Sequence, residues 1–303
     1  MSASLALLLA MQQVVVPLGG AKPAPKYPAP LATAGPAFAR ECEGKDGWDE
    51  PAPPVRVHGN TYYVGTCGIT ALLLTSRDGH VLIDTGTEAG AELVAANIRR
   101  LGFKLSDVKW IVHSHEHHDH VGGFARMRAL TGGEVAASIN AAAVLRSGQT
   151  GSGDPQFGTL PRMAPVPVAR VLRDGDTLRL GGILLTAIET KGHTHGALSW
   201  RWVSCDGGVC RTMVYADSLS PVSSDSYRFS DHPNVVAAFR ASFAKVAALE
   251  CDIVLTPHPS ASNMAARFDG GAAALFDPAG CKNYAASKAK ALDERLAKEA
   301  LAK

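Results

Sequence analysis

The residues best suited to chemistry in this 303-residue sequence are histidines that gather in one short segment. Five of the eleven histidines fall within positions 113–120, which read HSHEHHDH. Imidazole and carboxylate ligands without a thiolate suit zinc. Four side chains of this kind follow one another inside the segment: His115, His117, Asp119 and His120.

The spacing of these four side chains favours two adjacent metal ions. They cannot all face one point on a regular strand or helix, but the end of a strand that runs into a loop can present them to two metals. His115 and His117 lie two residues apart and therefore share one side of an extended backbone. Asp119 and His120 then turn toward a neighbouring position.

Two further histidines follow predicted strands elsewhere in the chain. His193 lies in the segment GHTHG, after a strand that ends at Thr190, and His258 lies in TPHP, after the strand Ile253–Thr256. Loops at strand ends commonly form the edges of active sites. A surface histidine tract that binds metal adventitiously would have no such partners. We therefore expect a site with two zinc ions per chain.

The remaining histidines have no such setting. His113 precedes the motif on a buried strand, so we expect a core residue or a support behind the ligands. His118 occupies a spacer position and is expected to point away, while His195 is expected at the rim. The others are expected at the surface: His58, His80 and His232.

The elements that must position these residues are short strands and a few helices. Apolar residues at Val94, Ile98 and Leu101, followed by Gly102, predict a helix over Glu88–Leu101. The strands predicted in the first half are Thr61–Gly65, Ala71–Ser76, His80–Asp84 and Val108–His113. Those predicted in the second half are Val168–Leu172, Leu178–Leu180, Ile183–Glu189, Leu198–Val203, Met213–Ala216 and Ile253–Thr256. Later helices are predicted over Asn234–Leu249 and Ala285–Leu301.

One long loop separates the two halves. Residues 147–165 are rich in Gly, Ser and Pro, and loops of this length are usually functional or mobile. Gln156 and Phe157 lie within it and could line the mouth of the site; an ordinary loop role for both is an equal alternative.

The first residues predict an exported protein. Two apolar stretches, 5–10 and 14–18, precede the small residues 19–21, as before a signal-peptidase cleavage site, although no Lys or Arg comes before them. We expect a signal peptide over 1–21, an extended arm over 22–57 that is rich in Pro, Ala and Gly, and a domain over 58–303. No other stretch reaches 18 apolar residues, so no membrane span is expected.

The cysteines agree with export to the periplasm or the medium. Their number, six, is even and no CxxC pair occurs, which favours disulfides over a zinc finger. Cys205 and Cys210 flank a turn and are a plausible local pair; six reduced thiols in a cytosolic protein are the alternative. The complete set is Cys42, Cys67, Cys205, Cys210, Cys251 and Cys281.

Composition excludes some partners. Hydrophobic residues make up 46% and charged residues 19% of the chain, which is ordinary for a globular protein. The formal net charge is only +2 and no run of five basic residues occurs, so nothing indicates nucleic acid as a partner. We expect a monomer that acts on a small molecule.

Six motifs together resemble the subclass B3 enzymes of the metallo-β-lactamase superfamily. The resemblance runs from about Trp48 to Tyr284, and only the short His-x-His-x-Asp-His motif is common to the whole superfamily. The motifs are VGTCGIT (64–70), LIDTGTE (82–88), SHEHHDHVGG (114–123), GHTHG (192–196), YADSLS (215–220) and TPHPSASN (256–263).

The resemblance implies an α+β fold, an αββα sandwich of two mixed sheets flanked by helices. It assigns the first zinc to His115, His117 and His193. It assigns the second zinc to Asp119, His120 and His258. It also implies three disulfides, which pair Cys42 with Cys67, Cys205 with Cys210, and Cys251 with Cys281.

The implied activity is hydrolysis of the β-lactam amide in penicillins, cephalosporins and carbapenems, which gives antibiotic resistance. The nucleophile would be a zinc-bound hydroxide that Asp119 orients. Ser218 and Ser220 would hold the substrate carboxylate and an ordered water. The sequence departs from the family at His195, where proline is usual, and at His118, where an apolar or aromatic residue is usual. Because neither position is a ligand, we expect these departures to affect substrate preference.

Three other functions compete with this interpretation. A thioesterase or lactonase of the same fold would use Asp217 as a carboxylate that bridges the metals. A serine β-lactamase needs Ser-x-x-Lys, which occurs three times here, but no Lys-Thr-Gly accompanies it. A zinc-storage protein would not need two metals at a strand edge with an open coordination position.

Overall fold

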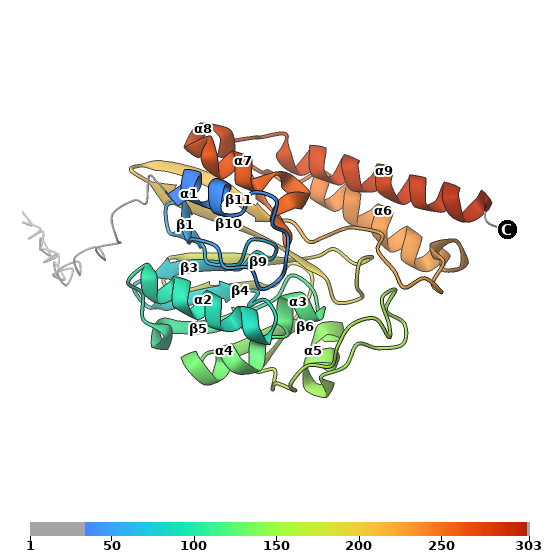
Figure 1. Ribbon diagram of the computed structural model, residues 1–303, viewed down its shortest axis with the longest axis horizontal. Coiled ribbons are helices and arrows are strands. Elements are labelled where there is room, and N and C mark those ends of the chain that lie inside the picture. Colours follow the sequence, from blue (N-terminus) through green and yellow to red (C-terminus); the bar gives the residue numbers. More distant parts are fainter. Residues whose placement is uncertain (1–33, 302–303) are drawn as a thin grey trace, which may run out of the picture.

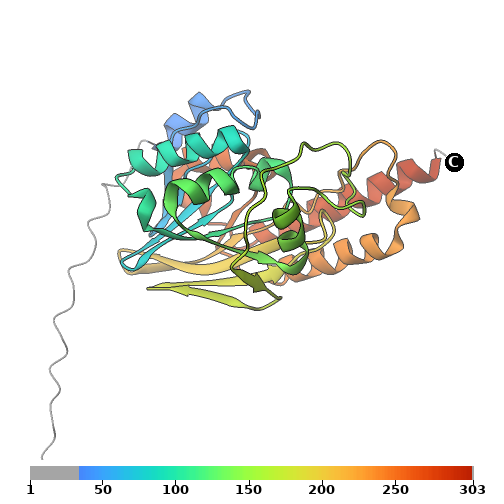
Figure 2. The ribbon, with the colours of Figure 1, turned by 90° about the horizontal axis from the view of Figure 1, so that it is seen from below.

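Two β-sheets pack face to face in the computed structural model, and helices cover both outer faces (Figure 1, Figure 2). The structure describes residues 34–301. The predicted αββα sandwich is confirmed, and both sheets are mixed because each contains parallel and antiparallel pairs. Within the described part of the chain, no helix has the length and apolar character needed to cross a membrane.

The larger sheet has seven strands in sequence order. Its first four strands pair antiparallel and the rest pair parallel. They are β1 (Val55–His58), β2 (Thr61–Tyr63), β3 (Leu72–Ser76), β4 (Gly79–Ile83), β5 (Val108–Val112), β6 (Glu134–Ser138) and β7 (Arg170–Leu172).

The smaller sheet has five strands in the order β12-β11-β10-β9-β8. Only the pair of β11 and β12 is parallel. The strands are β8 (Thr177–Leu180), β9 (Ile183–Glu189), β10 (Leu198–Asp206), β11 (Val209–Tyr215) and β12 (Ile253–Leu255).

Helices α2, α4 and α5 lie on the outer side of the larger sheet, and α6 and α9 cover the smaller one (Figure 1). The α-helices are α1 (Ala34–Glu41), α2 (Glu88–Arg100), α3 (His118–Val121), α4 (Phe124–Thr131), α5 (Ile139–Ser147), α6 (Pro233–Ala247), α7 (Met264–Asp269), α8 (Gly271–Leu275) and α9 (Gly280–Leu301).

The strand β3 shows how the sequence builds this sandwich. Leu72 and Leu74 point into the core between the sheets, whereas Leu73 joins the core beneath the outer helices. Side chains alternate along a strand, so a continuous apolar run is needed where both faces are covered. The run of three leucines therefore identifies a strand buried on both sides.

The predicted strands are confirmed, with end shifts of a few residues, whereas the segment 118–147 holds elements that were not predicted. It forms α3, α4, β6 and α5. These elements are short, and β6 and α5 are rich in alanine, so neither shows a clear helical or strand period.

The predicted extended arm needs correction. Residues 34–41 form the helix α1, because Phe38 and Cys42 lie one turn apart and are both buried. The Phe38 ring packs edge to face on Tyr63 and Phe268, at centroid distances of 5.0 and 5.2 Å. The predicted signal peptide, 1–21, and the arm residues 22–33 lie outside the described residues.

Three disulfides join the pairs that the family resemblance implies. The Cys205–Cys210 bond closes the hairpin between β10 and β11, where the two residues face each other. The others link α1 to the segment after β2, and the start of β12 to α9: Cys42–Cys67 and Cys251–Cys281.

Candidate metal centre

The predicted ligands meet where strands of both sheets end. The backbone leaves β5 at Val112, passes through the irregular segment 113–117, and enters α3 at His118. The loop after β9 brings His193, and the turn after β12 brings His258. The strand-end placement that the sequence indicated therefore collects residues that lie more than a hundred positions apart.

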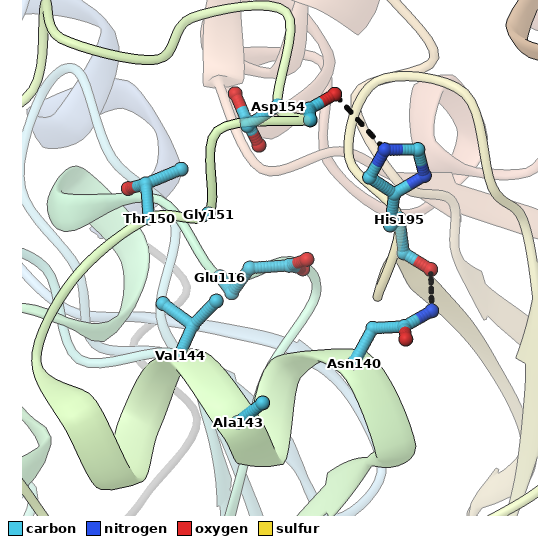
Figure 3. A pocket seen from close by; sticks show the side chains of 9 residues that line it. Glu116, Asn140, Ala143, Val144, Thr150, Gly151, Asp154 and His195 are labelled. Atoms are coloured by element: carbon cyan, nitrogen blue, oxygen red, sulfur yellow. Dashed lines mark hydrogen bonds between the residues drawn. The ribbon is translucent and has the colours of Figure 1, made fainter.

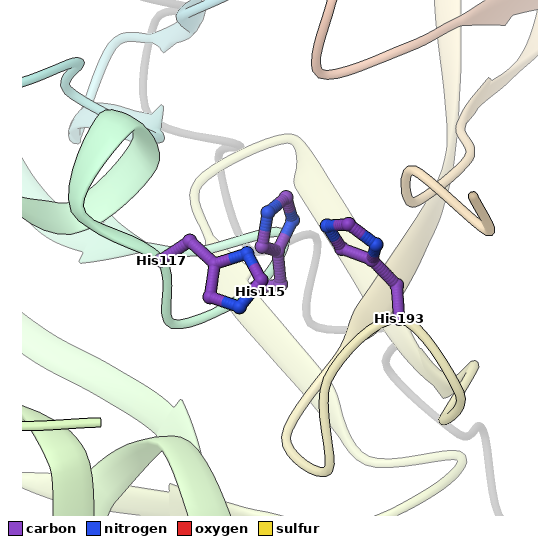
Figure 4. A group of neighbouring side chains, drawn as sticks. All are labelled: His115, His117 and His193. Carbon is purple, nitrogen blue, oxygen red and sulfur yellow. The ribbon is translucent and has the colours of Figure 1, made fainter. Parts of the chain in front are cut away.

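Three histidines form the first possible metal position. One ring nitrogen each from His115, His117 and His193 lies within 4.8 Å of the others, and all three side chains are buried. Figure 4 shows the rings of these residues turned toward one another. The spacing suits one ion coordinated by imidazole nitrogens.

The second possible position adjoins the first. Ligand atoms of His115, Asp119 and His120 also lie within 4.8 Å of one another. Nε2 of His258 lies 3.4 Å from Asp119 Oδ2 and 3.4 Å from His120 Nε2. Because His115 is common to both groups, the two positions are neighbours.

Backbone carbonyls hold the outward nitrogens of two histidines. Nδ1 of His193 donates to the carbonyl oxygen of Ser220 at 2.8 Å. Nδ1 of His258 lies 3.2 Å from the carbonyl oxygen of Gly68. A carbonyl only accepts, so each contact fixes the proton on Nδ1 and leaves Nε2 as a ligand atom.

Buried carboxylates hold the two histidines of the His-x-His pair. Nδ1 of His115 lies 2.9 Å from Asp217 Oδ1, and Nε2 of His117 lies 3.1 Å from both oxygens of Asp154. These contacts leave Nε2 of His115 and Nδ1 of His117 facing inward. A carboxylate behind an imidazole fixes the ring and makes it a stronger ligand.

Asp84 supports the fifth histidine. Its Oδ2 lies 3.3 Å from His120 Nδ1, and it also accepts hydrogen bonds from Ser114 Oγ and Tyr215 OH at 2.7 and 2.8 Å. The residue is fully buried and has a φ of 59°, a conformation that a non-glycine residue rarely adopts. The bonds from both sheets hold this carboxylate in place.

The donor set fits a metal ion. His115 Nε2 is buried and has no hydrogen-bond partner among the described residues, which is costly for a polar atom unless it binds something else. Burial lowers the pKa of His115 well below its ordinary value, and burial with the nearby His117 lowers the pKa of His193 to about 3. Both rings are therefore neutral at physiological pH, as metal ligands must be.

The pair of Asp119 and His120 attracts positive charge. Burial alone would raise the pKa of Asp119, but His120 and His258 hold it well below its ordinary value. Burial would likewise lower the pKa of His120, yet Asp119 raises it to about 10. A metal ion at this position would take the place of that proton, because metal and proton compete for the same nitrogen.

The family model described as "Metallo-beta-lactamase superfamily" matches residues 64–258, more than half of the chain. The chain belongs to this superfamily. Its membership extends to subclass B3, since it is 44% identical to MEM-A1, a subclass B3 metallo-beta-lactamase from a soil metagenome library. That match has a TM-score of 0.82 and covers 85% of this chain and all of MEM-A1, 100%.

Other solved metallo-beta-lactamases are similar over nearly their full length. MIM-2 is 51% identical with a TM-score of 0.84, and the match covers 88% of this chain and 98% of MIM-2. MIM-1 from Novosphingobium pentaromativorans is 49% identical with a TM-score of 0.84, covering 87% of this chain and 98% of MIM-1.

Curated relatives match less of their length. A probable metallo-hydrolase of Burkholderia pseudomallei is 29% identical over 152 residues, 45% of this chain and 48% of the relative. A hydroxyacylglutathione hydrolase of Rhodopseudomonas palustris is 28% identical over 128 residues, 40% of this chain and 41% of the relative. The chain thus spans about half the length or less of these curated relatives.

Glu116 is a residue of the site that sequence reasoning missed. Its carboxylate accepts hydrogen bonds from Thr194 Oγ1 and Gly196 N at 2.7 and 2.8 Å, and burial raises its pKa. A Cβ on Gly196 would lie 2.6 Å from Glu116 Oε2, so glycine is required there. Glu116 therefore ties the loop of His193 to the histidine motif.

The carboxylates that support the candidate ligands differ in how far the sequence could have indicated their roles. Glu116 lies inside the motif and could have been suspected as a charged residue between buried ligands. Asp84 lies within the LIDTGTE motif, but nothing local indicates its role. Asp154 follows a Gly- and Ser-rich stretch of the long loop, where nothing in the sequence indicates a contact with His117.

The predicted substrate contacts lie at different depths. Nε2 of Gln156 is 3.4 Å from His117 Nδ1, whereas the side chain of Phe157 on the same loop is 52% exposed. Ser218 is buried and its Oγ has no hydrogen-bond partner within residues 34–301, whereas Ser220 is half-buried. The loop thus reaches the metal centre through Gln156 and the solvent through Phe157.

His113 and His195 have the roles that the sequence indicated. His113 is buried, and its Nε2 accepts a hydrogen bond from Ser138 N at 3.1 Å; burial lowers its pKa to about 4. His195 is exposed, and its Nε2 donates to the carbonyl oxygen of Gly153 at 3.0 Å. His195 and Glu116 line one cavity of about 210 Å³ beside the metal centre (Figure 3).

The surface prediction for His80 is wrong. The residue is only 6% exposed because it lies on β4, whose faces are both covered, and it packs edge to face on Phe103 at 5.1 Å. His58 and His232 are half-buried. His118 is half-buried too, and its ring lies 6.5 Å from that of Trp48.

Proposed function

We propose that this protein is a zinc-dependent β-lactamase that hydrolyses the amide of penicillins, cephalosporins and carbapenems with two zinc ions per chain. The observation that carries the proposal is that five histidines each have their outward ring nitrogen facing a protein oxygen. Their inward nitrogens converge with Asp119. The similarity to metallo-beta-lactamases over nearly the whole length of their chains supports it.

The ligand assignment follows the geometry. His115 Nε2, His117 Nδ1 and His193 Nε2 would hold the first ion. Asp119, His120 and His258 would hold the second. When bound, zinc lowers the pKa of a coordinated water toward neutrality and polarises the carbonyl that is attacked.

The chain's own residues orient the reactants. Asp119 remains ionised, so it accepts a hydrogen bond from the attacking water and directs a lone pair of that water at the lactam carbon. The hydroxyls of Ser218 and Ser220 hold the carboxylate that neighbours the scissile bond. Gln156 and Phe157 line the mouth and contact the substituents of the substrate.

A thioesterase or lactonase is the second candidate, because one curated relative is a hydroxyacylglutathione hydrolase. That candidate requires Asp217 to bridge the metals. Asp217 is fully buried and lies 2.9 Å from the outward nitrogen of His115, which supports a positioning role. The contact therefore favours the β-lactamase.

The proposed setting is the periplasm or the medium, where the enzyme would give antibiotic resistance as a monomer. Three disulfides support export, since such bonds persist mainly in oxidising compartments. Peptide mapping of the mature exported protein tests both the cleavage site and the pairings.

The proposed function is tested by hydrolysis of a chromogenic cephalosporin and by metal counting with mass spectrometry of the folded protein. We expect two zinc ions per chain, and activity that disappears with a chelator and returns with zinc. A parallel assay with a lactone and a glutathione thioester identifies the alternative. Turnover of those substrates without β-lactam hydrolysis would overturn the proposal.

A further inference from the structure

Lys288 brings a positive charge to the segment that carries the two predicted substrate-binding serines. It lies on α9, the long helix that covers the smaller sheet beside α6 (Figure 1). Its Nζ donates to Ser220 Oγ at 2.9 Å. Because the carbonyl of Ser220 accepts from His193, the ammonium group lies beside the first metal position.

Lys288 makes no close ion pair within residues 34–301, and the buried Asp217 acts on it only at longer range, opposing the lowering of the Lys288 pKa by burial. No carboxylate among residues 34–301 lies within 4.0 Å of its Nζ, although the side chain is half-buried. By contrast, the exposed Lys290 lies 3.7 Å from Glu294 on the same helix. A lysine has three N–H donors, and only one donates to a protein hydrogen-bond acceptor here.

The same helix fixes the serine segment. Tyr284, one turn before Lys288, donates its hydroxyl to the carbonyl oxygens of Asp217 and Ser218 at 3.0 and 2.6 Å. Nζ of Lys288 lies 5.2 Å from the centre of the Tyr284 ring. The ring and the hydrogen bond to Ser220 together hold the ammonium group toward the site.

A second observation points to a ligand at this place. Ser218 Oγ is buried and has no hydrogen-bond partner within the described chain. A buried hydroxyl without a partner is costly unless an acceptor reaches it, and the Lys288 ammonium has N–H groups left to donate beyond its bond to Ser220. Lys288 Nζ contacts Ser220, two residues after Ser218, so one short segment carries both donors, which suits a small anion with two acceptor oxygens.

We propose that Lys288 is the cation that binds the substrate carboxylate and thereby selects anionic substrates. The proposal rests on the proposed function, in which that carboxylate neighbours the scissile amide. On binding, the flexible stem lets Nζ move from Ser220 Oγ to a carboxylate oxygen. The Ser220 hydroxyl, which donates to the carbonyl oxygen of Ser218 at 3.1 Å, would turn to the same carboxylate. Lys288 would then contribute to substrate binding more than to turnover.

The test compares Lys288→Met with Lys288→Arg on a chromogenic cephalosporin and on its methyl ester. For the free acid we expect Lys288→Met to raise KM about tenfold with kcat little changed, as when one charge-assisted hydrogen bond is lost. Lys288→Arg should restore most of the affinity. The ester lacks the charge, so its kinetics should be the same in all variants.

Lys290→Met is the matched control, because it removes the same charge from the same helix. Metal content and the unfolding temperature are measured for every variant. Lys288→Met affecting acid and ester equally would indicate a structural role and overturn the proposal, as would an unchanged KM for the acid.

Calorimetric binding of the acid and its ester separates this inference from the proposed function. If the wild-type protein hydrolyses neither compound, the proposed function fails. Tighter binding of the acid that disappears in Lys288→Met would still support the anion site. Equal binding of acid and ester by the wild-type protein would overturn the proposed anion site.

Discussion

The two possible metal positions are built differently although both groups of ligand atoms include His115. Every histidine of the first position is nearly inaccessible: His115, His117 and His193 are 0%, 2% and 5% exposed. In the second position the side chain of His258 is 31% exposed and its outward nitrogen meets only a carbonyl, at 3.2 Å. The first position is therefore closed on all sides, while the second opens to solvent at His258 although its His120 is fully buried.

Because of this difference, we expect the two positions to differ in metal affinity and in their contribution to activity. Two of the three histidines of the first position lie against buried carboxylates, whereas in the second position only His120 does, so we expect the first ion to be bound more tightly. Among the candidate ligands of the described chain, only Asp119 of the second position is a carboxylate, and the neighbouring His258 side chain is partly exposed. The second ion should exchange more readily and should govern activity.

Removal of the carboxylate ligand should give the largest effect. Asp119→Ala should release the second ion, retain the first, and lower kcat by about 10²–10⁴-fold, because water loses both its orienting group and one metal. Metal counting and steady-state kinetics check this result. Retention of two ions with ordinary kcat would show that Asp119 belongs to neither position.

The first position should weaken when its support is neutralised. Asp217→Asn should lower the affinity of that ion by about 10–100-fold, the range typical of supports behind a ligand histidine. Zinc titration in the presence of a competing chelator measures this change. Asp206→Asn is the control, because Asp206 pairs with Arg56 at a distant, partly exposed site. Loss of both ions from Asp217→Asn would instead indicate a carboxylate that bridges them.

The pH dependence of zinc affinity should separate the positions. Asp119 raises the pKa of His120 to about 10, so zinc must displace a proton there, and affinity should rise about tenfold per pH unit below that value. The pKa of His193 is lowered to about 3, so its proton does not compete at neutral pH. Zinc titrations between about pH 6 and 8 should show one pH-dependent and one nearly constant step. An equal dependence of zinc affinity on pH in both steps would contradict the proposed difference between the two positions.

The smallest expected effect concerns Ser218, which supports neither ion. Ser218→Ala should raise the activation free energy for kcat/KM by about 0.5–1.5 kcal/mol, the net contribution of one hydrogen bond, with both ions retained. The kinetics and metal content of the purified variant check this. A loss of zinc would indicate that Ser218 stabilises the metal centre and does not serve in substrate binding.

Local sequence patterns were sufficient to predict the candidate ligands, and their binding of metal stays a prediction. The alternation of His115 and His117 is a property of extended backbone, and strand-end positions for His193 and His258 follow from the apolar runs before them. The leucine run of β3 likewise predicts a strand covered on both faces, and this supports a layered fold. These features depend on neighbours within a few residues, so the chain itself determined them.

The supports behind the ligands were decided only by the tertiary structure. Asp154 is 37 positions from His117, and Asp217 is 102 positions from His115. Lys288 is 68 positions from Ser220. A polar side chain in a loop or on a helix shows no local sign of the partner that folding brings to it. Burial and hydrogen-bond partners come from packing two sheets and their helices together, so the sequence determined which residues are candidate metal ligands and the fold decided what holds them.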